Sequence, residues 1–139
     1  SAASDVYKRQ VASRASRRIE DGLLDAAQPV LLEVNVSGEE TKSGFSVDEV
    51  RQAILHLQTL YGIRVCGLMT MAPRGDKKVT RATFAGLREL RDELSVEYPD
   101  LSLDELSCGM SEDFEIALEE GSTIVRLGRV VFDPAFAVE

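Results

Sequence analysis

The sequence has very few of the side chains on which many enzymes depend. Its 139 residues include one histidine, two cysteines and no tryptophan, and aromatic residues make up only 6%. His56 lies in a helical-looking run that favours a surface or groove position, so Ser-His-Asp and Cys-His chemistry have little support. Cys66 and Cys108 stand apart in apolar surroundings, which favours small buried side chains over a disulfide. No CxxC or HxxxH pattern suggests a zinc site.

Long apolar runs and excess positive charge are also missing. No stretch approaches the roughly 20 apolar residues that a membrane helix needs. The first ten residues, SAASDVYKRQ, lack the apolar region of a secretory signal. Asp and Glu number 24 against 16 Lys and Arg, and the net charge of -8 argues against a general nucleic-acid binder. We therefore expect a cytoplasmic protein without membrane or nucleic-acid partners, although a few local groups could still bind a small anion.

The residues that are present alternate between strand and helix patterns. The apolar fraction of 44% and charged fraction of 29% are typical of one globular domain. We predict helices over residues 12–27, 46–60, 80–96 and 111–120, and strands over 30–36, 63–69, 103–107 and 123–127. Ser46 and Glu49 form a capping box at the second helix, and Thr80 and Ser111 are the predicted caps of the next two. Apolar residues at helical spacing are predicted to face inward in three helices. They are Val50, Ala53, Ile54 and Leu57, with Leu60 near the end, in the second helix; Phe84, Leu87, Leu90 and Leu94 in the third; and Phe114, Ala117 and Leu118 in the last.

This alternation predicts an α/β fold with parallel strands joined by helices. In such folds, ligands bind beyond the carboxyl ends of the strands. Those ends fall here at residues 35–37, 69–71, 107–111 and 126–129, which also hold the unusual polar residues. This coincidence is the first indication of a binding site.

Four residues near the last two strand ends could bind an anion. Ser111 is either an ordinary helix cap or a phosphate ligand, with Gly109 allowing the backbone to approach closely. Arg126, inside an apolar strand, either pairs with a carboxylate such as Glu33 or Glu105 or donates from the floor of a ligand site. The amides of a tight turn at Gly128 could bind a phosphate. Arg129 is either an exposed loop arginine or a charge at the rim.

The earlier strand ends offer weaker candidates. Glu33 and Asn35 share one strand face and could line a pocket, although Asn35 could instead cap its own loop. Lys42 lies in a mobile-looking loop, where lysines are usually solvated. Met69 and Met71 are typical core residues that could also cover the face of a flat ligand.

Several segments together resemble one family. LLEVNVSGEETKSGF, GLMTMAP and LSCGMSEDFEIALEEGSTIVRLG, in this order, are similar to the YggS/PROSC family of pyridoxal 5′-phosphate (PLP) homeostasis proteins. The similarity covers roughly residues 16–132. It implies a TIM barrel of the alanine-racemase-like type and an intracellular role in buffering PLP or delivering it to apoenzymes, without robust catalysis.

The resemblance also implies roles for single residues. Arg126 would hydrogen-bond the pyridine nitrogen and keep it unprotonated, which weakens the electron sink that racemases use. Ser111, Gly128 and Arg129 would hold the phosphate through a hydroxyl and backbone amides. Many family members have Thr or Ser in place of Arg129, so its main chain is the better supported ligand. Asn35 and Met71 would line the ring pocket, and no metal is implied.

The sequence departs from the family at both ends. Residues 1–10 resemble a foreign leader and residues 134–139 a foreign tail, which leaves residues 11–133 as the family segment. A TIM barrel takes about 200–250 residues, so we expect the last four βα units of a barrel, without the first strand and its Schiff-base lysine. Lys42 is not the usual Schiff-base lysine.

Two other functions remain open at this point. One is a PLP-dependent amino-acid racemase, which needs an anchoring lysine and a second acid/base group, commonly a tyrosine from a partner subunit. Tyr61 and Tyr98 fall at helix ends and Tyr7 in the leader, and none lies in a recognisable motif. The other is an inactive barrel fragment whose unpaired edge strands cause partial folding or aggregation.

Overall fold

The structure is a computed structural model that describes residues 27–40 and 42–136. In chain order, its elements are β1 (Gln28–Glu33), α2 (Glu49–Leu57), β2 (Ile63–Met69), α3 (Lys77–Glu97), β3 (Glu105–Met110), α4 (Phe114–Glu119), β4 (Ile124–Arg126) and α5 (Arg129–Phe132). The predicted leader (1–10), nearly all of the helix predicted over 12–27 and the end of the predicted tail (137–139) lie outside the described residues.

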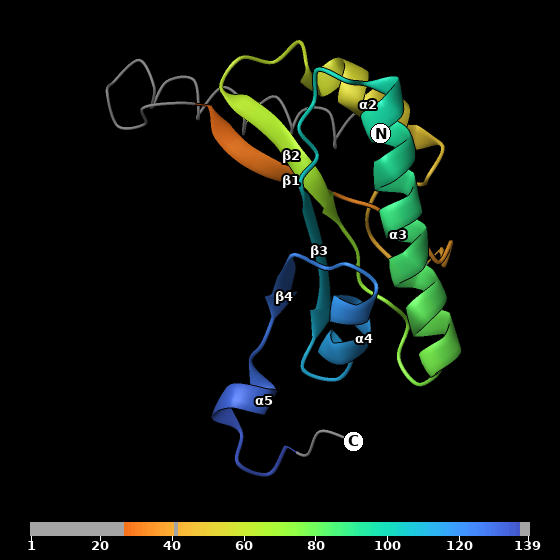
Figure 1. The fold of residues 1–139 in the computed structure, drawn as a ribbon, viewed down its shortest axis with the longest axis vertical. Coiled ribbons are helices and arrows are strands. Elements are labelled where there is room, and N and C mark those ends of the chain that lie inside the picture. The colour runs from red at the N-terminus through yellow and green to blue at the C-terminus, as the bar shows by residue number, and fades with distance from the viewer. Residues whose placement is uncertain (1–26, 41, 137–139) are drawn as a thin grey trace.

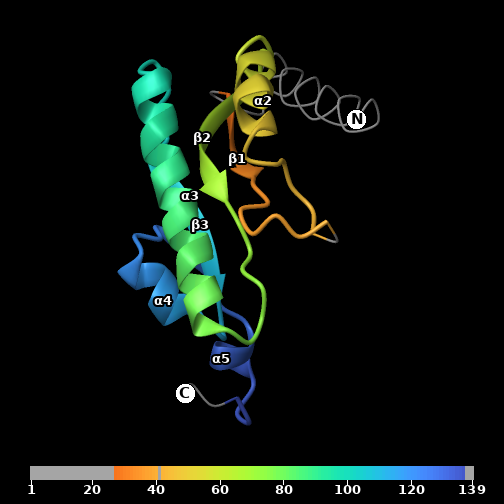
Figure 2. The same ribbon diagram turned by 90° about the vertical axis from the view of Figure 1, so that its right-hand side faces the viewer.

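The four strands form one parallel sheet in the order β1-β2-β3-β4. Each strand is therefore hydrogen-bonded to the one before it in the chain, and a helix connects each consecutive pair. Figures 1 and 2 show α2, α3 and α4 on the same side of this sheet. The predicted α/β fold with a parallel sheet is confirmed. Among the described elements, no helix covers the opposite face.

The strand register separates a buried face from an open one. Leu32, Leu68 and Leu106 are aligned across three strands, and each is at most 5% exposed beneath the helices. The next aligned row points the other way, because side chains alternate along a strand. It consists of Glu33, Met69, Ser107 and Ile124. This second row lies on the face that no described helix covers.

The helices pack on the buried face through the predicted apolar stripes. Val50, Ala53, Ile54 and Leu57 of α2 and Phe84, Leu87, Leu90 and Leu94 of α3 are all buried, which confirms both stripes. Burial of each large side chain contributes roughly 1.5–3 kcal/mol. The inward placement of Leu118 is wrong, because α4 is short and only Ala117 is buried, while Leu118 is 54% exposed. None of the described helices combines the length and apolar character needed to cross a membrane.

The starts of α2 and α3 are fixed by side-chain hydrogen bonds. The capping box before α2 is confirmed: the Glu49 amide donates to Ser46 Oγ at 3.2 Å, and the Ser46 amide donates to the Glu49 carboxylate at 3.4 Å. The prediction that Thr80 caps the next helix is wrong. Asp76 caps α3 instead, because its carboxylate accepts from the amides of Lys78 and Val79. Thr80 lies one turn inside the helix and is buried.

Two strands end three residues away from their predicted carboxyl ends, and β4 is one residue shorter at each end than predicted. β1 ends at Glu33, and Val34 forms only an isolated bridge to Phe45, so the predicted strand over 30–36 is too long at its carboxyl end. β3 ends at Met110 rather than at residue 107. The register of β3 against β4 shifts between Ser107 and Met110, so the strand continues past the irregular stretch at Gly109.

Two hydroxyl groups fasten the short strand β4 beside β3. The Ser122 hydroxyl lies 2.7 Å from the Cys108 carbonyl and 2.9 Å from the Ile124 carbonyl. Thr123 Oγ1 accepts from the Leu106 amide at 2.8 Å and donates to the Glu105 carboxylate at 2.6 Å. These contacts extend the pairing of a three-residue strand and fix where its carboxyl end lies.

Ion pairs join neighbouring helices on the outer surface. Arg51 of α2 pairs with Glu97 of α3 at 2.8 Å. Glu120, at the end of α4, pairs with Arg81 at 2.9 Å and Arg88 at 2.8 Å, both on α3. Hydrogen bonds from these guanidinium groups lower the pKa of the Glu97 and Glu120 carboxyls below their ordinary value of 4.5.

Candidate functional site

The candidate residues gather around the carboxyl ends of the strands, as predicted. The segments after β1 and β2 line one cavity of about 230 Å³, which is bordered by Glu33, Val34, Asn35, Lys42, Ser43, Thr70 and Met71. A second cavity, of about 310 Å³, lies between the segments after β2 and β3 and shares Lys42 and Met71 with the first. The two cavities therefore adjoin along these two side chains.

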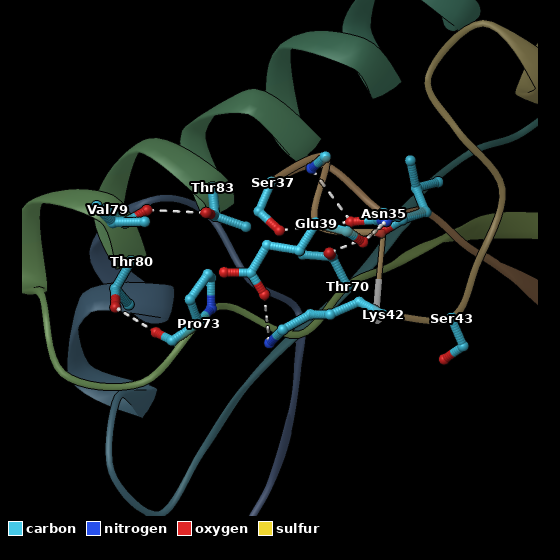
Figure 3. A network of polar contacts seen from close by, with 12 residues as sticks. Asn35, Ser37, Glu39, Lys42, Ser43, Thr70, Pro73, Val79, Thr80 and Thr83 are labelled. Atoms are coloured by element: carbon cyan, nitrogen blue, oxygen red, sulfur yellow. Dashed lines mark hydrogen bonds and ion pairs between the residues drawn. The ribbon is translucent and has the colours of Figure 1, made fainter.

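Asn35 organises the loop after β1 (Figure 3). Its side-chain nitrogen donates to the Glu39 carbonyl at 2.7 Å, and its side-chain oxygen accepts from the Gly38 amide at 3.2 Å. These are the hydrogen bonds of an Asn that caps its own loop, one of the two roles predicted for it. Asn35 also borders the first cavity, and its role in lining a ligand pocket stays a prediction.

Lys42 differs from the solvated lysine predicted for this loop. Its side chain is only 29% exposed, and Nζ lies 3.9 Å from the Glu39 carboxylate (Figure 3). On the same loop, the Ser43 hydroxyl donates to the Glu33 carboxylate at 2.8 Å. The loop folds back over the first cavity because these contacts join it to the end of β1.

Thr70 closes the first cavity beneath Asn35. It is 1% exposed, and its hydroxyl donates to the Val34 carbonyl at 2.7 Å. Met71 follows on the same segment, is half-buried and borders both cavities. Thr70 was not among the predicted site residues, although a polar residue between two methionines at a strand end is a usable signal for one.

Ser111 lies at the carboxyl end of β3 and joins it to the segment after β4. Its hydroxyl oxygen accepts from the backbone amides of Gly128 at 3.3 Å and Val130 at 3.1 Å. The prediction that Ser111 caps the following helix is wrong, because β3 continues to Met110 and the helix begins only at Phe114. Ser111 is 6% exposed, so its hydroxyl is held at a fixed place between the two strand ends.

The turn around Ser111 is shaped by Gly109 and Asp113. The Asp113 carboxylate accepts from the Met110 amide at 2.8 Å, which folds the chain tightly after β3. Gly109 has a φ of +100°, and a Cβ there would lie 2.6 Å from the Ala117 side chain. A glycine is therefore needed at this position for close packing against helix α4.

Arg126 is on β4, in register with Met110 of β3. Its side chain is exposed, and within the described chain it makes no ion pair. The proposed pairings with Glu33 and Glu105 are not formed among the described residues; the Glu33 carboxylate accepts from Ser43 and the Glu105 carboxylate accepts from Thr123. Arg126 thus remains an exposed cation one residue before the turn that reaches Ser111.

Gly128 and Arg129 form the turn after β4. Gly128 has a φ of -127°, so it does not use the conformational freedom of glycine, and its amide is directed at Ser111. The Arg129 guanidinium pairs with the Glu112 carboxylate and lies 5.3 Å from the centre of the Phe136 ring. Arg129 lies in a helical turn, so its predicted placement in a loop is wrong, but its side chain is 53% exposed, as the alternative of an exposed arginine predicted.

Glu112 lies between two arginines. Besides Arg129, its carboxylate faces Arg74 Nε at 3.7 Å. The hydrogen bond from Arg129 is the main reason that the pKa of the Glu112 carboxyl lies below its ordinary value. The sequence analysis treated Glu112 only as an acid in a first helical turn, and no local pattern indicated its partner 17 residues away.

The structure divides the predicted residues into two groups. Ser111, Gly128 and Arg129 come together at the ends of β3 and β4. Asn35 and Met71 come together in the first cavity. Arg126 belongs with the first group by its position on β4, but it borders neither of the two cavities described above.

The cysteines and the histidine lie apart from both groups. Cys108 is 3% exposed in the core, and burial raises the pKa of its thiol. Cys66 is half-buried and its sulfur lies 3.5 Å from the Val30 carbonyl. His56 sits on α2, where its Nε2 atom is buried and has no hydrogen-bond partner among the residues that the structure describes. The side chains of both cysteines are therefore part of the packing of the described fold.

A family model and several known proteins match this chain. The model of the alanine racemase N-terminal domain matches residues 6–134. The pyridoxal phosphate homeostasis protein of Aquifex aeolicus is 48% identical over 106 residues, which are 76% of this chain and 46% of that protein. Its counterpart from Pseudomonas aeruginosa is 38% identical over 128 residues, or 91% and 53% of the two chains. The chain thus spans about half the length of these relatives.

Solved structures show the same fold. A protein of unknown function from Bifidobacterium adolescentis has a TM-score of 0.77 and 39% identity, covering 90% of this chain and 48% of that one. PipY from Synechococcus elongatus, solved without PLP, has a TM-score of 0.74 and 34% identity, covering 88% and 57%. The PLP-bound structure of PipY matches with a TM-score of 0.69 and 27% identity, covering 87% and 66%.

Proposed function

Because the chain belongs to the alanine racemase N-terminal domain family, we propose that it binds PLP and takes part in PLP homeostasis. The observation that carries this proposal is the convergence of the Ser111 hydroxyl with the amides of Gly128 and Val130 at two adjacent strand ends. The names of its relatives and the PLP-bound structure of PipY support the choice of ligand. The proposed partners are PLP itself and the apoenzymes that would receive it.

We further propose that the described sheet is the last half of a TIM barrel, made of four βα units. Two observations support this. The strands follow one another in the order of the sequence, and α2, α3 and α4 lie on one side only (Figure 1). In a doubly wound sheet the strand order reverses and helices cover both faces, whereas a barrel keeps all helices outside. The open row with Glu33, Met69 and Ser107 would then face the barrel interior.

The donor set at Ser111 fits a phosphate group. Phosphate oxygens are recognised in many proteins by backbone amides together with a hydroxyl, at the carboxyl ends of parallel strands. Here the two amides donate to a single oxygen atom, Ser111 Oγ, and a phosphate oxygen bound next to this hydroxyl could take over their hydrogen bonds. Ser111 would then donate its hydroxyl proton to the phosphate. Gly128 leaves the approach open, since nothing lies within 4 Å of where its Cβ would be.

The ring of the cofactor would lie toward β4 and β1. Arg126, exposed and unpaired among the described residues, would donate to the pyridine nitrogen and keep it unprotonated. Asn35 and Met71 would line the ring pocket from the first cavity. PLP, when bound, supplies a reactive aldehyde and an electron-withdrawing ring. An arginine at the nitrogen weakens the second property, which suits carriage of the cofactor better than catalysis.

The positions of the tyrosines also favour a role without catalysis. Tyr61 lies two residues before the start of β2, and Tyr98 follows α3 ahead of β3, so both belong to the amino ends of the strands. The candidate site is at the carboxyl ends. Neither side chain is therefore placed to act as the second acid/base group at the site of its own chain, and Tyr7 lies outside the described residues.

Covalent attachment gives a test of this proposal. Lys42, half-buried and facing Glu39 at 3.9 Å, is not proposed as an anchor. Treatment of the chain with PLP and borohydride, followed by peptide mass analysis, should give no stoichiometric adduct on a single lysine, while PLP still binds reversibly. A specific stoichiometric adduct on Lys42 would contradict the assignment, and racemisation of alanine by the chain with PLP would contradict the absence of catalysis.

A further inference from the structure

We infer that Glu112 and Arg129 form a positioning pair that holds the backbone amides of Gly128 and Val130 against Ser111. The pair would act on the phosphate through these amides and not by contacting the phosphate itself. The inference rests on the proposed function, because the amides matter for a ligand only if they bind its phosphate.

Two short segments meet at this place through three side-chain contacts. Ser111 accepts from the amides of Gly128 and Val130. The next residue of the same segment, Glu112, pairs with Arg129, which lies between those two amides in the chain. The sheet pairing between β3 and β4 ends just before, at Met110 and Arg126. Beyond that point, these side chains carry the connection between the two segments.

Apolar packing does little to hold the segment after β4. α5 is a single turn of four residues and contains no buried residue. Its apolar side chains Val131 and Phe132 are 60% and 82% exposed, and Leu127 before it is 38% exposed. A segment with so few buried contacts opens easily unless polar contacts hold it. The Glu112–Arg129 pair is therefore well placed to set how often the amides leave Ser111.

The contacts of the Arg129 side chain explain why it positions the two amides and does not bind the phosphate itself. Its guanidinium is engaged by the Glu112 carboxylate on one side and lies over the Phe136 ring at 5.3 Å. The second oxygen of Glu112 faces Arg74 at 3.7 Å. Together these three charged side chains carry one net positive charge, so Glu112 does not present an unpaired carboxylate to an anion.

The two possible roles of Arg129 predict opposite effects of the same substitution. If Arg129 contacted the phosphate directly, removal of the Glu112 charge would free the guanidinium and tighten phosphate binding. If the pair positions the amides, the same substitution lets them move and weakens phosphate binding. Glu112→Gln separates these cases, because it keeps the size of the side chain.

The experiment measures amide hydrogen exchange at Gly128 and Val130 by NMR in the ligand-free chain. E112Q and R129Q should each speed exchange at both amides by about two- to fivefold, which is the range for a partly exposed ion pair. The double variant should show little further increase, and the exchanged pair E112R/R129E should return toward the original rates. High salt should remove most of the difference between the original chain and E112Q. R51Q, which breaks an ion pair between α2 and α3, serves as the control and should leave these two amides unchanged.

A titration with inorganic phosphate, followed through the same two amide signals, completes the test. E112Q should bind phosphate about two- to fivefold more weakly than the original chain. Unchanged exchange in both single variants, or tighter phosphate binding by E112Q, would overturn the inference. If the exchange rates change as expected while no variant binds phosphate or PLP, the pair still positions the amides and it is the proposed function that fails.

Discussion

Ser111 and Val130 are 19 residues apart in the sequence, yet the Ser111 hydroxyl oxygen lies 3.1 Å from the Val130 backbone nitrogen and accepts its hydrogen bond. This contact joins the end of one strand to the turn after the next. A hydroxyl and an amide that are widely separated in the chain are thereby brought together at one place in the fold. The position of that space, at the carboxyl ends of parallel strands, is where α/β folds bind ligands.

Replacement of Ser111 by alanine tests the phosphate ligands. The Ser111→Ala variant loses a hydroxyl donor and leaves the amides of Gly128 and Val130 without their present acceptor. We expect PLP to bind about 5- to 30-fold more weakly, which corresponds to the loss of one or two hydrogen bonds. A spectroscopic PLP titration measures this. Ser102→Ala, at an exposed serine before β3, is the matched control, and equal affinity in both variants would contradict the role of Ser111.

Gly67 is predicted to be essential for pairing of β2 with β3. A Cβ at this position would lie 2.0 Å from the Glu105 carbonyl oxygen, so the two strands would have to separate. We expect Gly67→Ala to lower the free energy of unfolding by about 1–3 kcal/mol or more, because overpacking usually costs about this much. Urea unfolding measures it. Gly128→Ala, which has open space and a negative φ, should change stability by less than about 0.5 kcal/mol.

Two leucines on neighbouring helices should differ sharply in their contribution to stability. Leu94 of α3 is fully buried, while Leu118 of α4 is 54% exposed. Leu94→Ala removes core contacts and leaves a cavity, so we expect a loss of about 2–5 kcal/mol in unfolding free energy. Leu118→Ala should cost about 0.5 kcal/mol or less. Similar losses in the two variants would mean that α4 packs differently.

Stability should fall in mild acid. The pKa values of Glu97, Glu112 and Glu120 lie below the ordinary 4.5, mainly because arginine side chains donate hydrogen bonds to them. A carboxylate with a lowered folded-state pKa stabilises the fold above its unfolded pKa, and this contribution is lost as the pH falls through the folded pKa. We expect the free energy of unfolding to decrease between about pH 5 and about pH 3. Glu97→Gln should flatten this decrease, and an equal slope in that variant would show that its pair with Arg51 contributes nothing.

The regular part of the fold could be predicted because the spacing of apolar residues along a helix or strand indicates which face is buried. The stripes through Leu57 and Leu94 and the capping box at Ser46 all depend on residues within a few positions of one another. The same local signals indicated strand ends as the place for a site. The order of the strands follows from short connections between consecutive elements.

The errors arose where distant contacts decide the structure. Ser111 has the pattern of a helix cap, but its hydroxyl is taken by amides after β4, and Asp113 shapes the turn instead. Thr80 likewise lost the cap of α3 to Asp76, whose carboxylate reaches two free amides. The pairing of Glu112 with Arg129 depends on β4 lying beside β3, which no local pattern encodes.

Comparison of PLP with pyridoxal, which lacks the phosphate, tests PLP binding through Ser111 and its neighbouring amides most directly. Both compounds should be titrated into the folded chain under the same conditions. We predict saturable binding of PLP at one site, and affinity for pyridoxal lower by about 100-fold or more, because charge-assisted hydrogen bonds to the phosphate are lost. Equal affinity for the two compounds, or no saturable binding of PLP by the folded chain, would contradict the proposal.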